Sequence, residues 1–177
     1  MKTSPRRLAA AGLLLGATQV VAASLVAGTW QSFDFYDDIK NTAWVDGNLK
    51  LISFDVSLTA PAYLKVVDVG FSGDRFEVFA NGVSLGTTSA PVDAGNADQG
   101  LDFDAAFADS RWSQGVFALQ PGNYTITGHA TGFAPNVLAG TGGIQLVPEP
   151  TTWLLLGAGL ATLGLSARRR THTFKGE

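Results

Sequence analysis

The sequence contains no cysteine and only two histidines, His129 and His172. The absence of cysteine excludes disulfide bridges, thiol catalysis and cysteine-based zinc sites. A Ser-His-Asp triad would have to use His129, because His172 lies in the C-terminal tail, and no serine lies in a nucleophile-elbow motif. We therefore interpret His129 as a half-exposed strand residue. The sequence predicts a protein that is not an enzyme.

Positive charge is scarce in the middle of the chain. The whole sequence has 12 basic and 15 acidic residues, for a net charge of -3, but seven of the basic residues lie near its two ends. Residues 24–149 hold five basic and fourteen acidic residues, which leaves a net charge of −9. Such a segment does not bind nucleic acid or anionic lipid through its overall field. Cations, basic partners and neutral sugars remain open as ligands.

Uncharged apolar runs are confined to the two ends of the chain. Near the N-terminus, basic residues precede the apolar stretch Leu8–Val21, and Val21 and Ala23 place small residues at the −3 and −1 positions of a signal peptidase site. This pattern predicts a secretory signal peptide over residues 1–23. Cuts after Ala22 or Ala27, or an uncleaved anchor, are the alternatives.

The second apolar run, Thr151–Ala167, has 17 residues and no charge. A membrane-spanning helix needs about 20 apolar residues, so this run is at the lower limit of length. Arg168, Arg169 and Arg170 follow it directly and would hold that end in the cytoplasm, with everything before Val147 outside. An ordinary tail anchor is the alternative to the more specific signal described next.

A short proline-containing segment lies directly before this run: Val147, Pro148, Glu149 and Pro150. Pro-Glu-Pro, an apolar helix and an Arg cluster, in that order, resemble the PEP-CTERM sorting signal of Gram-negative bacteria. The resemblance covers residues 148–170 and leaves 171–177 as a cytoplasmic tail. It implies that an exosortase recognises Pro-Glu-Pro and cleaves near it, releasing the protein from a temporary inner-membrane anchor. The implied destination is the cell surface, the outer envelope or the medium.

The segment from residue 24 to residue 147 has the length of one domain and the periodicity of strands. Leu51–Leu58 alternates apolar and polar residues. Arg75–Ala80 and Val83–Thr88 flank Asn81-Gly82, the strongest short-range signal of a type I′ hairpin. A further turn is expected at residues 120–123, and residues 101–107 are the only ambiguous helical window. These patterns predict an all-β fold: a single antiparallel β-sandwich that resembles a jelly roll.

An acidic segment follows the predicted hairpin. Carboxylate oxygens from a loop suit Ca²⁺, which takes about 6–8 oxygen ligands. Asp98, Asp102 and Asp104 are therefore candidate ligands of one Ca²⁺ ion, the only cofactor that the sequence suggests, although a solvated acidic loop is the simpler alternative. Asp68 and Asp74, on either side of a glycine-containing turn, are a further candidate pair.

Four aromatic residues are candidates for stacking on sugar rings: Trp30, Tyr36, Trp44 and Trp112. Trp112 lies in a predicted loop and is, of the four, the candidate for exposure and ligand binding. Burial in the core is the alternative for all four, since large aromatic side chains are mostly buried in a domain of this size.

Two functional hypotheses follow. The first is an exported, non-enzymatic surface or matrix protein, with signal peptidase and exosortase as processing partners. The resemblance implies an association of such a protein with exopolysaccharide and biofilm. The second is a carbohydrate-binding or carbohydrate-active β-sandwich. An exposed row of aromatic residues or a carboxylate-lined cleft would favour the second hypothesis over the first.

Overall fold

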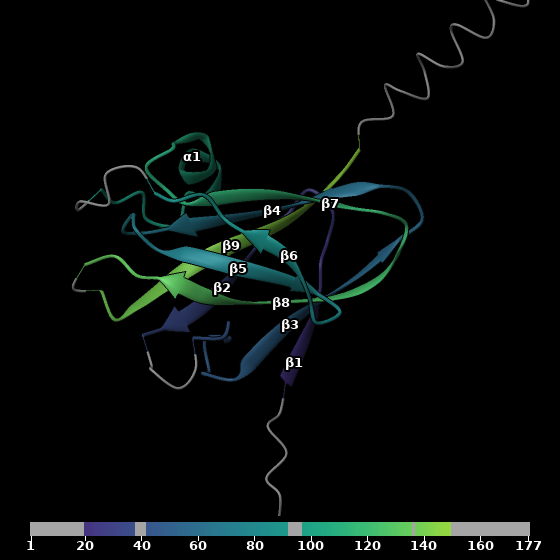
Figure 1. Cartoon of the computed structure of the whole chain (residues 1–177), viewed down its shortest axis with the longest axis horizontal. Coiled ribbons are helices and arrows are strands. Elements are labelled where there is room, and N and C mark those ends of the chain that lie inside the picture. The colour runs from purple at the N-terminus through teal and green to yellow at the C-terminus, as the bar shows by residue number, and fades with distance from the viewer. Residues whose placement is uncertain (1–19, 38–41, 92–96, 136, 150–177) are drawn as a thin grey trace, which may run out of the picture.

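The computed structural model describes residues 20–37, 42–91, 97–135 and 137–149, which form a two-layered β-sandwich with one short helix (Figure 1). The elements, in chain order, are β1 (Val20–Ser24), β2 (Trp30–Tyr36), β3 (Leu51–Leu58), β4 (Ala62–Val69), β5 (Arg75–Ala80), β6 (Val83–Thr87), α1 (Phe103–Ala108), β7 (Gln114–Leu119), β8 (Gly122–Gly132) and β9 (Ala139–Pro148). No helix in these ranges is long and apolar enough to cross a membrane. The two apolar runs predicted to enter the membrane lie outside the described residues, apart from the last residues of the first.

The strands form two sheets. One has the order β1-β3-β8-β5-β6 and the other the order β2-β9-β4-β7. From β2 to β9, successive strands lie in opposite sheets, except for the β5–β6 hairpin, and their ladders are antiparallel. Without β1 this is the strand order of an eight-stranded jelly roll. The predicted antiparallel sandwich is therefore confirmed.

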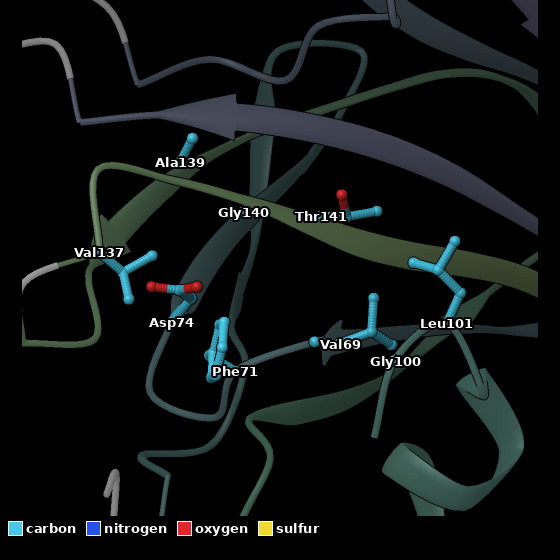
Figure 2. A pocket seen from close by; sticks show the side chains of 10 residues that line it. Val69, Phe71, Asp74, Gly100, Leu101, Val137, Ala139, Gly140 and Thr141 are labelled. Carbon is cyan, nitrogen blue, oxygen red and sulfur yellow. The ribbon is translucent and has the colours of Figure 1, made fainter. Parts of the chain in front are cut away.

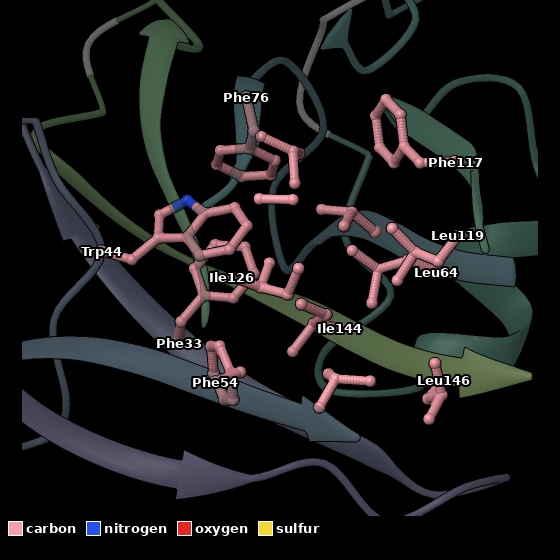
Figure 3. Packing of buried hydrophobic residues seen from close by; sticks show 14 of the residues in the cluster. Phe33, Trp44, Phe54, Leu64, Phe76, Phe117, Leu119, Ile126, Ile144 and Leu146 are labelled. Atoms are coloured by element: carbon pink, nitrogen blue, oxygen red, sulfur yellow. The ribbon is translucent and has the colours of Figure 1, made fainter. Parts of the chain in front are cut away.

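The core between the sheets is rich in aromatic rings (Figure 3). The Phe33 ring stacks on the Trp44 indole with 3.9 Å between centroids, and the Phe76 ring meets Phe33 edge-on at 5.2 Å. Glycines on the neighbouring strands make room for these rings: a Cβ at Gly128 would collide with the Trp44 indole, and one at Gly142 with the Phe33 ring. The core thus depends on small residues on β8 and β9 as much as on large ones elsewhere.

The two predicted turns connect their strands in different ways. Asn81 and Gly82 connect β5 to β6 with φ values of 50° and 77°, the positive values that a type I′ turn requires, so the predicted hairpin is confirmed. The turn at residues 120–123 does not make a hairpin. It takes the chain from β7, which pairs with β4, to β8, which pairs with β3 and β5 in the opposite sheet.

The first strand includes the end of the predicted signal peptide. β1 pairs in parallel with residues 51–55 of β3 at the edge of the five-stranded sheet. A cut after Ala23 would leave only Ser24 of this strand. The eight strands of the jelly roll begin at β2, so the sandwich topology is complete without β1. The cut itself stays a prediction.

Candidate functional site

The candidate sorting segment leaves the sandwich from the end of β9. Val147 lies opposite Tyr63 of β4, and Pro148, the last residue of the strand, lies opposite Ala62. The backbone N–H of Glu149 donates to the carbonyl of Pro61 at 3.3 Å. Pro148 and Glu149, the first two residues of Pro-Glu-Pro, are therefore held beside the start of β4. Pro150 and the Arg cluster at 168–170 lie outside the described residues.

A second candidate site is built on two buried carboxylates, one near the end of β4 and one in the connection from β4 to β5. Asp68, near the end of β4, has an exposed fraction of 0%, and its Oδ2 accepts the backbone N–H groups of Gly73 and Asp74, both at 3.1 Å. Its Oδ1 has no hydrogen-bond partner among the described residues, and neither has the buried Ser72 Oγ. Burial, together with the negative charge of Asp74, raises the pKa of Asp68 to about 8. Asp68 is thus mainly protonated at neutral pH.

Asp74 differs from Asp68 because it faces an open pocket. Its exposed fraction is 1%, and its Oδ1 accepts the Ala134 backbone N–H at 2.8 Å. Burial raises the pKa of Asp74 to about 6, so this carboxylate is mainly ionised at neutral pH. A Cβ at Gly140 would lie 2.8 Å from its Oδ2, so glycine keeps the space in front of the carboxylate free.

The pocket has a volume of about 200 Å³ and is formed by three segments: the β4–β5 connection, the residues just before α1, and the chain around the start of β9 (Figure 2). Its walls are mainly apolar. Phe71 and Leu101 line it with exposed fractions of 52% and 66%, and Val137 lines it from the third segment. The arrangement is an apolar pocket with one ionised carboxylate in its lining, which suits a ligand with an apolar part and a positive charge.

Comparison with known families bears on the first candidate site, the sorting segment. A model described as the PEP-CTERM protein-sorting motif matches residues 146–170. The chain carries a PEP-CTERM sorting motif. The match begins within β9 and ends at Arg170, so it contains the whole signal predicted at residues 148–170.

No curated protein matches this chain. Among solved structures, it is similar to the pre-peptidase C-terminal domain of collagenase from Bacillus anthracis, with 9% sequence identity and a TM-score of 0.41. The similarity covers 74% of this chain and 99% of that one.

The three aspartates proposed as calcium ligands have separate partners. Asp98 Oδ1 accepts the Gly100 backbone N–H at 2.7 Å, and Asp102 caps α1 by accepting the Ala105 N–H at 2.9 Å. Asp104 Oδ1 accepts the Trp30 indole N–H at 2.8 Å. Within the described ranges, no three or more His, Cys, Asp or Glu residues are grouped as metal ligands. The structure thus does not bring the three together, and calcium binding stays a prediction.

The prediction that Trp112 is exposed is wrong. Its exposed fraction is 0%, because its indole is packed with Val67 and Val69 of β4 and Ala106 of α1. The indole N–H donates to the Gly70 carbonyl at 3.2 Å, so the polar atom is satisfied inside the fold. A Trp112 indole in this position has no free face for a sugar ring.

The other three aromatic candidates and His129 differ in how far the structure exposes them. Trp44 is also buried, with an exposed fraction of 1%, whereas Tyr36 is 39% exposed. Trp30 is partly buried and stacks on Phe103 of α1, with 5.6 Å between ring centroids. His129 is a half-exposed strand residue, as predicted, with its Nε2 3.5 Å from Glu77 Oε2.

Sequence reasoning singled out Asp68 and Asp74 as a pair but missed the pocket beside Asp74. The signal available in the sequence was the pair of glycines between them, Gly70 and Gly73, both of which have positive φ. Gly140 and Leu101, which complete the pocket, are far away in the sequence and carry no local signal.

Proposed function

We propose that this chain is exported, anchored transiently in the inner membrane by residues 151–167, and released by an exosortase to the cell surface or the medium. The observation that carries the proposal is the PEP-CTERM motif at residues 146–170. The position of Pro-Glu-Pro supports it: Pro148 is exposed and is the last residue of β9, so this element begins where the last strand ends. The released product is then the intact sandwich, without its membrane segment.

We further propose that the released sandwich is a non-enzymatic protein of the surface or matrix that associates with exopolysaccharide. Two of the four aromatic residues considered for sugar stacking, Trp44 and Trp112, are buried, which favours this role over a carbohydrate-binding module with an aromatic platform. Co-sedimentation of the released protein with exopolysaccharide from the producing cells tests this part. A released protein that stays entirely in the supernatant contradicts it.

The sorting step is tested by changing Pro148, Glu149 and Pro150 to alanine. The variant is expected to accumulate as an unprocessed, membrane-retained form, because the apolar run and the Arg cluster would still stop translocation. Mass spectrometry of the protein recovered from the envelope and the medium gives both new ends of the chain. Pro121→Ala, in the turn between β7 and β8, is the control and should be processed like the parent chain. Processing and release of the triple variant at the parent's rate would overturn the proposal.

A further inference from the structure

We propose that the pocket beside Asp74 binds the side chain of a lysine presented by a basic partner protein. The first support is the carboxylate itself. Asp74 is 99% buried, and while its Oδ1 accepts the Ala134 N–H, its Oδ2 makes no hydrogen bond with any described residue. Because Asp74 lines the pocket, a cation that enters the pocket can reach this oxygen and pair with the carboxylate charge in largely apolar surroundings.

The second support is the apolar wall. Val69, Phe71, Leu101 and Val137 line the pocket, and Phe71 and Leu101 expose large apolar surfaces at it (Figure 2). A lysine side chain has a flexible apolar stem of four carbons and an ammonium group with three N–H donors. The stem would cover the apolar wall while the ammonium donates to Asp74 Oδ2, so one side chain satisfies both features.

Other cations fit the lining less well. Ca²⁺ takes about 6–8 oxygen ligands, but most of the wall is carbon, and the Thr141 hydroxyl already donates to Asp34 Oδ1 at 2.8 Å. An amino sugar would place its hydroxyl groups against Phe71 and Leu101, where they lack hydrogen-bond partners. The net charge of −9 on residues 24–149 also favours encounter with a basic partner.

The test uses the full chain in non-ionic micelles at about pH 8, above the pKa of about 6 to which burial raises Asp74, so that this carboxylate is ionised. The probe is n-butylammonium, followed by saturation-transfer NMR, with n-butanol as its neutral counterpart. Butylammonium is expected to bind about tenfold more tightly than butanol. A short peptide with one lysine should displace it, and the same peptide with norleucine in place of lysine should not.

Matched variants distinguish binding in the pocket from general attraction to the negative charge of the protein. Asp74→Asn keeps an oxygen for the Ala134 N–H and is expected to weaken butylammonium binding about tenfold. Asp55→Asn removes the same charge from an exposed position on β3 and should leave binding unchanged. Phe71→Ser and Leu101→Ser change exposed side chains, so they should preserve the fold. Each should weaken the binding of butylammonium more than the binding of methylammonium, which has no apolar stem.

Three results would overturn the proposal. Equal binding of butanol and butylammonium would remove the role of the charge, and unchanged binding to Asp74→Asn would remove the role of this carboxylate. Displacement by Ca²⁺ or glucosamine at lower concentration than by the lysine peptide would assign the pocket to a metal or to an amino sugar.

Discussion

At the scale of single residues, the aspartates of this chain have different roles that depend on where the fold places them. Asp102 caps a helix, whereas Asp109 forms a salt bridge to Arg111 at 2.6 Å, and hydrogen bonds from that arginine lower the pKa of Asp109. Asp68 is fully buried, and burial raises its pKa. Because all three side chains are chemically identical, only their surroundings in the fold distinguish a surface charge from a neutral buried acid.

The raised pKa of Asp68 predicts a pH dependence of stability. The pKa is about 8 in the folded chain against an ordinary value of 3.8, so between these two pH values the folded state holds a proton that the unfolded chain has released. The stability from this group is fully present below the unfolded pKa and is lost as the pH rises through about 8. Asp74, with its pKa raised to about 6, contributes with the same sign over a lower range.

Asp68→Asn should therefore make the stability less dependent on pH between about pH 6 and about pH 8. The amide oxygen can accept both N–H groups that Asp68 Oδ2 accepts, so the loop keeps its hydrogen bonds. Thermal melts of parent and variant across this range measure the slope. Groups that titrate in both proteins cancel in the difference, and parallel curves would show that Asp68 does not titrate there.

At the scale of elements, α1 shows how a short helix is stabilised by what it covers (Figure 1). It has six residues, too few to be stable alone. Ala106 and the neighbouring Trp112 pack against Val67 and Val69 of β4, on the side of the sheet away from the main core. The last residues of β4 are buried without alternation for this reason, since one face meets the core and the other meets the helix segment.

The β5–β6 hairpin gives a prediction at the same scale. Gly82→Val should reduce the free energy of unfolding by about 1–3 kcal/mol, because Gly82 has a φ of 77°, which a β-branched residue adopts only under strain. Nothing lies within 4 Å of a Cβ at this position, so the cost comes from the backbone rather than from a collision. Urea denaturation followed by tryptophan fluorescence measures the change.

Gly47→Val is the matched control for this substitution. A Cβ at Gly47 also meets nothing within 4 Å, but its φ does not lie in the positive range. Gly47→Val should therefore change stability much less than Gly82→Val. Equal effects of the two substitutions would mean that the turn conformation at Gly82 is not what the valine disturbs.

At the scale of the whole molecule, the sandwich and the sorting motif meet at one strand. β9 pairs with both β2 and β4 in the four-stranded sheet, and the family match begins at residue 146, inside this strand. The order of parts implies that folding of the sandwich and processing of the motif involve adjacent residues. An enzyme that cleaves near Pro-Glu-Pro would therefore act within a few residues of the paired end of β9.

The Arg cluster after the apolar run is expected to fix the orientation of the chain in the membrane. Changing Arg168, Arg169 and Arg170 to Glu should weaken cytoplasmic retention of the C-terminal end, since orientation follows Lys and Arg rather than net charge. A reporter fused to the C-terminus measures its side of the membrane. Replacement of the same residues by Lys is the control and should keep the parent topology. An unchanged position of the Glu variant's reporter would contradict the role of the cluster.

Features decided by residues close together in the chain could be predicted from the sequence. Asn81-Gly82 specified its hairpin because the turn depends on two adjacent φ values. The PEP-CTERM motif was recognisable because its parts are contiguous, and family comparison confirms it at residues 146–170. The antiparallel sandwich followed from alternating apolar residues, a pattern of period two that each strand carries by itself.

Features decided by distant residues required the tertiary structure. Trp112 looked exposed in a loop, yet it is buried because β4, some forty residues earlier in the sequence, supplies the apolar surface under it. Asp98 and Asp104 are near neighbours in the sequence, but only the structure shows that Asp98 accepts the Gly100 N–H and that Asp104 accepts the Trp30 indole N–H. The pocket at Asp74 exists only because β9 brings Gly140 against the β4–β5 connection. The sequence determined the local conformation and the sorting signal, whereas long-range packing decided which polar groups are buried and which face an open site.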